Sequence, residues 1–501
     1  MSSGLVPAIA RTIAADAPDG WQRATLTATV GETWTYRSGP HYTPESDAPY
    51  EPGDDQHLHE QLTELHAELD AVDSLMLDLV VHTNGRFEAI TSECLKHLDP
   101  GYLYVREPYD LPAAPAESQP GPVRAVPAGD PQAAIELLHR YVGHAERILG
   151  RQPGELLAKL PDPVRADGGD LPADLLALYS VVDGDGGAGI FDNHAWFGLR
   201  GTLEPSERWW GERDWLTTVQ SSALLDCVPA LTVRRAHDWP AWIPFATDYF
   251  GNFLAVDLDP GPLGSPGQVI RIGKEYQDGP VYLADSVTSL LRLHVEALDR
   301  GDYTESGGNI VVNWNIADSK DRRRLEVNGV AVPLRGVHEG IQDLHVKNAF
   351  QVDLEPIRGL PALWNVALTN CAAADLGPLQ ETPVEELSVG LDQIDLSPLR
   401  GHPTVRRLKL HTRRPVDLSV LTTLPGLHSV DLSRAVIQDF SVLTRLPGLK
   451  YLGLRADQWP HVPPLPDVAA AGLLGDPTLA DGVDWAARFS SEDPARHLGT
   501  Y

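Results

Sequence analysis

The sequence predicts a multidomain α+β protein with an N-terminal α+β module, a central α+β domain and a C-terminal array of repeats. Three observations predict this architecture. The chain has 501 residues, which is long for one hydrophobic core and favours two to four domains. Residues 108–131 hold seven prolines and cannot form a helix or a sheet ladder, so we expect a semi-rigid linker there. An aspartate-centred pattern recurs five times between residues 341 and 455.

These observations place the domain boundaries. The expected parts are a first module at residues 1–107, the linker at 108–131, the central domain at 132–304, the repeats at 305–470 and a C-terminal cap at 471–501. We expect the cap to be helical near residues 484–489 and to cover the open end of the repeats, because a terminal repeat has no neighbour to bury its apolar face.

In the N-terminal module, apolar spacing predicts two helices and four strands. The helices are expected at residues 6–15 and 54–71, and the strands at residues 24–30, 33–37, 74–82 and 86–90. Asn84 and Gly85 give a strong two-residue hairpin turn between the last two strands. The order of these elements, with Trp21, Gly85 and Phe87, is similar to the YezG-like immunity family, and this resemblance implies a module that binds another protein.

Residues 242–298 hold the most regular pattern of the central domain. A turn signal lies at residues 248–252. Ser286 is suited to cap a helix whose apolar residues fall on one stripe, and Gly301 is suited to end it. Three strands are expected in this part of the chain, at residues 242–246, 253–258 and 268–273.

The motifs of this stretch resemble the SUKH superfamily, which includes the fungal Smi/Knr cell-wall synthesis regulators and many bacterial immunity proteins. They are WIPFATDYFGN, DLDP, GQVI and SVTSLL, preceded by LPADLLALY at residues 171–179. The resemblance covers residues 150–303. It implies an α+β domain that binds a protein, often a nuclease or related toxin and usually basic. The loop at residues 183–187 departs from the family pattern because it is acidic and longer.

Each C-terminal repeat begins near an aspartate and ends in the pattern LxxLxL. Their spacings are 22, 20, 22 and 22 residues, between Asp353, Asp375, Asp395, Asp417 and Asp439. This period resembles that of leucine-rich repeats, which implies a curved solenoid. In that geometry Arg407, Lys409 and His411 point away from the core. They form either a basic spot on a concave partner-binding surface or an ordinary solvated strand face, and the sequence leaves both readings open.

The net charge of −30 argues against nucleic-acid binding, which needs a basic surface. Residues 1–130 carry 7 Lys and Arg against 21 Asp and Glu. The negative electrostatic field of these acids would steer a basic partner toward the chain, or the acids would only keep the protein soluble. The chain has 33 Arg against 7 Lys, which is typical of a bacterial genome rich in G and C.

Several other classes of protein are disfavoured. No apolar run approaches the roughly 18 residues of a membrane helix, and the first residues lack the features of a signal peptide, so we expect a cytoplasmic protein that does not bind a membrane. The three cysteines lie far apart and fit neither a disulfide framework nor a zinc site. His57, His59 and His66 do not have the spacing of a metalloprotease motif. We therefore expect no metal, no cofactor and no enzymatic activity.

Tryptophans are frequent between residues 191 and 242. They are Trp196, Trp209, Trp210, Trp215, Trp239 and Trp242. A tryptophan in such a cluster either fills the core or anchors a protein interface.

The leading hypothesis is a cytoplasmic immunity or antitoxin-type protein that neutralises a basic toxin, possibly a nuclease, by direct binding. The alternative is a non-enzymatic scaffold or regulator of the Smi/Knr type. For Asn252 we favour a structural role in the turn over a contact with the partner. The residues expected to contact a partner are Asp183, Asp185, Asp248, Tyr249, Asn252, Asp257, Arg407, Lys409, His411, Tyr451 and Arg455.

Overall fold

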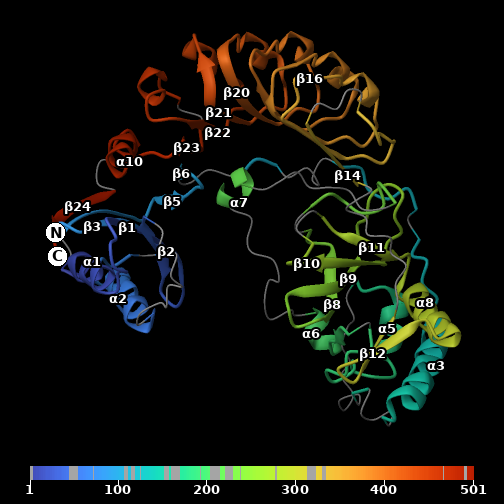
Figure 1. The fold of residues 1–501 in the computed structure, drawn as a ribbon. Helices are drawn as coiled ribbons and strands as arrows, with labels where there is room; N and C mark the ends of the chain where they lie inside the picture. Colours follow the sequence, from blue (N-terminus) through green and yellow to red (C-terminus); the bar gives the residue numbers. More distant parts are fainter. Residues whose placement is uncertain are drawn as a thin grey trace.

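The computed structural model shows a multidomain protein of mixed helix and sheet (Figure 1). The N-terminal sheet, the central domain and the repeats each have a hydrophobic core. The structure describes residues 4–44, 55–71, 73–106, 111–113, 119–124, 126–151, 157–158, 170–191, 193–203, 215–220, 229–236, 239–276, 279–312, 323–329, 334–465, 468–489 and 494–501. Much of the predicted linker, together with Trp209 and Trp210, lies outside these residues.

The N-terminal residues build an antiparallel sheet with two helices packed against it. Its elements are α1 (Leu5–Ala15), β1 (Arg23–Gly31), β2 (Thr35–Thr43), α2 (Asp55–Glu68), β3 (Ser74–His82), β4 (Arg86–Ser92) and β24 (Ala495–Thr500). The strand order is β2-β1-β3-β4-β24. Apolar residues alternate along β1 and turn Leu26 toward the core, opposite Leu79 of β3. The last strand of this sheet therefore comes from the far end of the sequence.

The central domain is a sheet covered on both faces. Its elements are α3 (Pro131–Leu149), α5 (Ala173–Tyr179), β7 (Ala195–Trp196), α6 (Leu199–Leu203), β8 (Trp242–Thr247), β9 (Asn252–Asp257), β10 (Gln268–Gly273), β11 (Val281–Ala284), α8 (Val287–Arg300), β12 (Tyr303–Ser306) and β13 (Asn309–Val312). Helix α7 (Trp215–Gln220) lies in the same part of the sequence but packs against the sheet of the repeats. The strand order is β11-β10-β9-β8-β7. Leu254 and Val256 of β9 pack in the core that includes α3 and α8, whereas Phe253 and Ala255 pack in a smaller cluster with Val233.

The sequence signals of this domain are confirmed where the structure describes them. Asp130 accepts backbone hydrogen bonds at the start of α3 from the N–H groups of Gln132 and Ala133. Ser286 accepts the N–H of Ser289 at the start of α8, and the helix ends at Gly301, which has a left-handed φ of 77°. The three predicted strands correspond to β8, β9 and β10.

The repeats build a sheet whose first eight strands run parallel. These strands are β14 (Arg324–Asn328), β15 (Asp343–Lys347), β17 (Asn365–Cys371), β19 (Glu386–Leu391), β20 (Arg407–Val416), β21 (Ser429–Ile437), β22 (Tyr451–Leu454) and β23 (Ala470–Leu474). The register pairs equivalent residues of successive repeats, such as Leu387, Leu408 and Val430. A small pair, β16 (Gln351–Val352) and β18 (Ala373–Ala374), lies beside it.

A short 3-10 helix follows the strand of most repeats, and in five of them the recurring aspartate lies one or two residues before the helix. The helices are η2 (Glu355–Ile357), η3 (Gly377–Glu381), η4 (Ser397–Leu399), η5 (Ser419–Thr423), η6 (Phe440–Arg445) and η7 (Trp459–His461). Asp353, Asp375, Asp395, Asp417 and Asp439 each accept the N–H of the residue two positions later, at 2.8–3.0 Å. Because an aspartate can satisfy this amide and turn the chain, the repeat keeps it at this position.

The sheet is extended by strands from the N-terminal part of the chain. These are β5 (Leu95–His97) and β6 (Gly101–Val105), and β6 pairs antiparallel with β23. Gly101 is needed at this junction, since it has a φ of +135° and an added Cβ would lie 1.9 Å from the Leu473 carbonyl oxygen. The helix expected near residues 484–489 lies earlier, as α10 (Leu479–Ala486), because Thr478 and Asp481 form a capping box there. The boundaries drawn at residues 107 and 471 stay predictions, and β6 and β24 both pair across them.

Candidate protein-binding surfaces

The turn between β8 and β9 presents two exposed aromatic side chains. We call residues 248–252 the aromatic turn. Asp248 accepts hydrogen bonds from the N–H of Phe250, at 2.8 Å, and from the N–H of Asn252, at 3.0 Å. Tyr249 is 72% exposed and Phe250 77% exposed. The backbone of the turn is thus fixed while both aromatic rings face solvent.

The electrostatics of the turn follow from these hydrogen bonds. Partial burial raises the pKa of Asp248, but hydrogen bonds from the side chain and backbone of Asn252 outweigh burial, so the pKa is lowered overall. Tyr249 adopts a left-handed backbone with a φ of 64°, and Thr247 Oγ1 accepts its N–H at 3.1 Å. The ring lies beside the acidic loop, because a Cβ added to Gly187 would lie 3.3 Å from its hydroxyl oxygen.

Three residues predicted to contact a partner are buried in this domain. Asp185 accepts the N–H groups of Gly187 and Ile190, so it shapes the acidic loop. Asn252 donates from Nδ2 to Asp248 and accepts the N–H of Glu275, which is the structural role favoured from the sequence. Asp257 lies at 0% exposure. Asp257 was expected to contact a partner and alternates with the apolar Leu254 and Val256, but both faces of the sheet are covered and the carboxylate is buried.

Asp257 is held by a buried polar network. Its Oδ2 accepts from Nε2 of Gln268 at 3.0 Å, and its Oδ1 accepts the N–H of Asp259 at 3.2 Å. Burial raises the pKa of Asp257 to about 7, although these hydrogen bonds oppose the shift. Asp183, by contrast, is half-buried and accepts the N–H of Leu199 at the start of α6.

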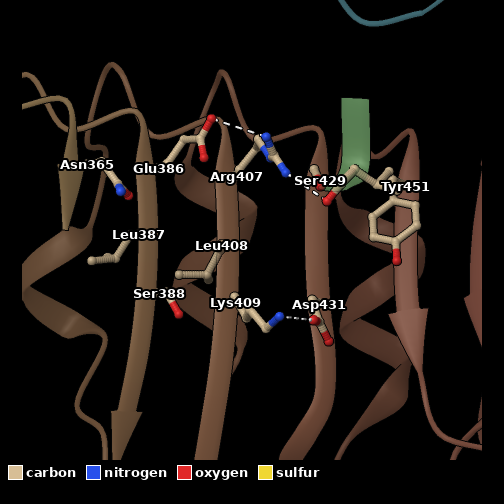
Figure 2. A pocket seen from close by; sticks show the side chains of 11 residues that line it. Asn365, Glu386, Leu387, Ser388, Arg407, Leu408, Lys409, Ser429, Asp431 and Tyr451 are labelled. Atoms are coloured by element: carbon tan, nitrogen blue, oxygen red, sulfur yellow. Dashed lines mark hydrogen bonds and ion pairs between the residues drawn. The ribbon is translucent and has the colours of Figure 1, made fainter. Parts of the chain in front are cut away.

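A second candidate surface lies on the sheet of the repeats, on the face that points away from their leucine core. We call this face the strand face. A hollow of about 210 Å³ lies in it. Figure 2 shows side chains that line this hollow. The residues that line the hollow are Val219, Asn365, Glu386, Leu387, Ser388, Arg407, Leu408, Lys409, Ser429, Asp431 and Tyr451.

The basic residues of the strand face are paired with acids of neighbouring strands (Figure 2). Arg407 Nη1 lies 3.1 Å from Glu386 Oε1, and Lys409 Nζ lies 3.2 Å from Asp431 Oδ2. Burial raises the pKa of Glu386, and the nearby Arg407 charge opposes that shift. The expected basic spot is therefore a mixed surface of alternating charge.

The other predicted residues of the repeats differ in exposure. His411 is exposed, and its pKa is lowered by partial burial and by the charges of Arg434 and Arg413. Arg455 is half-buried; it pairs with Asp457 and donates to the Ser433 carbonyl oxygen. Tyr451 is buried, because Leu103 of β6, Ala470 of β23 and Trp215 of α7 pack in one cluster with it. Burial raises its pKa.

A seam between the central domain and the repeats holds a larger cavity of about 470 Å³. Arg235 of the central domain makes an ion pair with Glu385 of the repeats and lies 3.9 Å from the centre of the Trp364 ring. The linker contributes Gln119, whose Oε1 accepts the N–H of Arg235. Neither this seam nor the exposure of Phe250 was predicted from the sequence. The seam has no local sequence signal, whereas Phe250 is an apolar residue next to Tyr249 in a predicted turn, which is a usable signal.

The described residues show no metal site. Within them, no group of three or more His, Cys, Asp or Glu side chains is arranged to hold a metal ion. No helix in the described part of the chain is long and apolar enough to cross a membrane.

The sequence of the central domain is similar to a known class of domain. Residues 167–293 match the SMI1 / KNR4 family (SUKH-1), so the chain contains a domain of this family. The particular relatives are fungal proteins. The chain is 43% identical over 78 residues to a "Glucan synthesis regulatory protein" of Neurospora crassa, and 32% identical over 94 residues to the "Cell wall assembly regulator SMI1" of Saccharomyces cerevisiae.

These similarities are confined to one domain. The alignment with the Neurospora protein covers 16% of this chain and 14% of that protein, and the alignment with the Saccharomyces protein covers 19% and 16%. A "Cell wall biosynthesis/cell cycle regulator smi1" of Schizosaccharomyces pombe is 37% identical over 75 residues, which are 15% of each chain. The chain thus spans about a seventh of the length of these relatives.

Two solved structures of Listeria monocytogenes internalins are also similar. One (inlF) has a TM-score of 0.24 at 24% identity over 26% of this chain and 41% of that chain. The other (inlC2) has a TM-score of 0.24 at 18% identity over 30% of this chain and 68% of that chain. TM-scores this low do not establish a shared fold, so the resemblance to leucine-rich repeats, like that to the YezG-like family, stays a prediction.

Proposed function

We propose that this chain is a non-enzymatic regulator that acts by binding other proteins, and that the aromatic turn of its SMI1/KNR4 domain is a contact surface. The observation that carries the proposal is the pair Tyr249 and Phe250, both more than two-thirds exposed on a turn fixed by hydrogen bonds. Aromatic side chains on a rigid backbone bury large area at low entropic cost, which is the usual composition of a binding hot spot.

The names of the relatives support the regulatory alternative over the immunity hypothesis. They are regulators of cell-wall assembly or glucan synthesis, and they come from fungi rather than bacteria. None of these three names mentions a toxin or an enzyme. The proposal for the rest of the chain is that the repeats form a solenoid scaffold holding a second partner surface, since repeat arrays offer extended faces for binding. The charge of −30 favours partners with a basic surface.

The test is quantitative affinity capture with the full chain from cells of the source organism. The double variant Tyr249→Ala/Phe250→Ala should lose at least one protein captured by the wild type, with the captured amount falling by about tenfold or more. The matched control is Tyr36→Ala/Phe350→Ala, which removes two aromatics of similar exposure, 72% and 76%, from other parts of the surface. The control should retain all captured proteins.

Equal loss in both double variants, or loss in neither, would contradict a role for the aromatic turn. Co-expression with any toxin-like protein that is encoded beside this gene tests the immunity hypothesis in parallel. Protection of the host by the wild type, lost in the turn variant, would replace the regulatory proposal with the immunity one.

A further inference from the structure

The strand face of the repeats is already occupied by a segment of the same chain. Helix α7 belongs to the central part of the sequence but lies at the strand face, beside the ends of β21 and β22 (Figures 1 and 2). Val219 of α7 lines the hollow together with Arg407 and Tyr451. Arg407 Nη2 also donates to the Val219 carbonyl oxygen at 3.0 Å. These two residues are 188 positions apart in the sequence.

Trp215 is the anchor of α7. Its side chain is 4% exposed and belongs to a cluster with Leu103 of β6, Tyr451 of β22 and Ala470 of β23. Tryptophan contributes more apolar area than any other residue and is enriched in protein interfaces. Trp215 therefore shows that the strand face can bind a tryptophan side chain.

The fit of α7 is incomplete. The indole N–H of Trp215 and the hydroxyl of Thr218 are buried without a hydrogen-bond partner among the described residues. A buried polar group left without a partner carries the full cost of its desolvation. A different segment that satisfied these positions would bind the same place more tightly than α7 does.

Arg407 supplies the second contact that a segment at this place would need. One side of its guanidinium is held by Glu386, which fixes its direction, and the other side donates to the backbone of α7. The acceptor is a main-chain carbonyl, so any peptide whose backbone follows the same course can accept this hydrogen bond, whatever its side chain at that position. The arrangement suits a short segment with one large aromatic residue.

We propose that the part of the strand face covered by α7, beside the hollow, is a docking site for a short peptide segment carrying a large aromatic residue, that α7 is its resident occupant, and that a partner segment binds by displacing α7. This inference rests on the proposed protein-binding function and adds a second surface to it. The partner's aromatic ring enters the Trp215 position, and a main-chain carbonyl of the partner accepts from Arg407. Because α7 is tethered in the same chain, it competes at high effective concentration and keeps the site closed to weak partners.

The experiment uses a fluorescent synthetic peptide with the sequence of residues 215–220 between short glycine flanks, and measures its binding to the full chain by fluorescence anisotropy. The wild type should bind it weakly. The variant Trp215→Ala should bind it at least about tenfold more tightly, because the resident anchor is gone. A peptide in which the tryptophan is replaced by alanine should bind neither protein.

Two further variants separate displacement from general loosening of the fold. Trp239→Ala removes a partly buried tryptophan of the central domain that packs away from the strand face, and it should bind the peptide no better than the wild type. Adding Arg407→Ala to Trp215→Ala should weaken peptide binding again, by about tenfold. Val219→Asp replaces a half-buried apolar contact of α7 by a charged side chain, and should open the site with the anchor tryptophan intact.

The inference is overturned if Trp215→Ala and Val219→Asp, each folded by circular dichroism, bind the peptide no more tightly than the wild type. It is also overturned if Trp239→Ala gives the same gain. Dimerisation of the opened variants in place of peptide binding would assign the site to α7 of a second copy and would also contradict the proposal. These outcomes are independent of the capture experiment with the aromatic turn, because the peptide assay needs no natural partner.

Discussion

Nη2 of Arg235 lies 2.6 Å from Oε1 of Glu385, and this ion pair joins the SMI1/KNR4 domain to the repeats. Both side chains are largely buried, and the Arg235 guanidinium also covers the ring of Trp364. Gln119 of the predicted linker binds the backbone of the same arginine. The described part of the linker therefore takes part in the contact between the two domains.

Removing the arginine of this pair should destabilise the contact. We expect Arg235→Ala to lower the free energy of unfolding by about 3 kcal/mol, because it leaves the Glu385 carboxylate buried without its partner charge. Chemical denaturation gives the change in stability, and small-angle scattering shows whether the two domains separate. Arg140→Ala is the control: its ion pair with Asp299 is exposed and should contribute about 1 kcal/mol or less. Equal effects of the two substitutions would contradict a special role for Arg235.

The last strand of the chain should stabilise the first sheet. His497 of β24 is buried, and its Nε2 lies 2.8 Å from Thr91 Oγ1 of β4. We expect His497→Ala to cost about 1–3 kcal/mol, because it leaves a buried hydroxyl without this partner. Leu498→Ala, one residue later on the same strand but exposed, should change stability by less than about 0.5 kcal/mol. Thermal unfolding followed by circular dichroism measures both, and a larger effect of Leu498→Ala would refute the assignment.

Asp257 should make stability fall as the pH rises. Its folded pKa of about 7 lies above the ordinary value of 3.8, so between these pH values the folded protein retains a proton that the unfolded chain has lost. The wild type should lose a few kcal/mol of stability from about pH 4 to pH 7 relative to Asp257→Asn, which has no such proton. Unfolding midpoints measured at half-unit steps of pH would show this difference.

The comparison must be made between the two proteins at each pH, because another buried group titrates in the opposite sense. Burial, with the charges of Arg271 and His194, lowers the pKa of His294 to about 3. The folded state then gains stability as the pH rises toward the unfolded value of about 6.5. This contribution is common to wild type and Asp257→Asn, and it cancels in their difference. A difference that does not change with pH would show that Asp257 is ionised in the folded state throughout.

Asn252 should act on stability and not only on binding. We expect Asn252→Ala to cost about 2–3 kcal/mol, because the N–H of Glu275 loses its acceptor and Asp248 loses a donor. Gln132→Ala, which removes an exposed side-chain hydrogen bond to Glu136, should cost about 0.5 kcal/mol or less. Urea denaturation measures both changes. An unchanged midpoint for Asn252→Ala would return this residue to the set of direct partner contacts.

Much of the local structure could be predicted from the sequence because it depends on neighbours along the chain. Ser286 and Gly301 delimit α8 through hydrogen bonds within a few residues, and each recurring aspartate turns the backbone two positions later. Likewise the alternation along β20 correctly placed Leu408 in the core and Lys409 on the opposite face. Each of these features is determined by residues within a few positions of one another, so a short stretch of sequence is enough to predict it.

The contacts that define the candidate surfaces could not be predicted in this way. Arg407 and Val219 are 188 residues apart, and Arg235 and Glu385 are 150 apart. No period or turn signal links such positions, since their pairing depends on how finished domains pack. Burial of Asp257 was missed for a related reason: alternation predicts a solvated face only when one side of the sheet is open to water.

The pairing of β24 with β4 also sets an order of events during synthesis. Thr91 and His497 are separated by 406 residues, so the ribosome must add about 400 residues after β4 before this strand receives its outer neighbour. Until then β4 presents an unpaired edge that another nascent chain could join. The first sheet is thus completed only after translation has passed through the repeats, and a chain that stops before β24 keeps the exposed edge of β4.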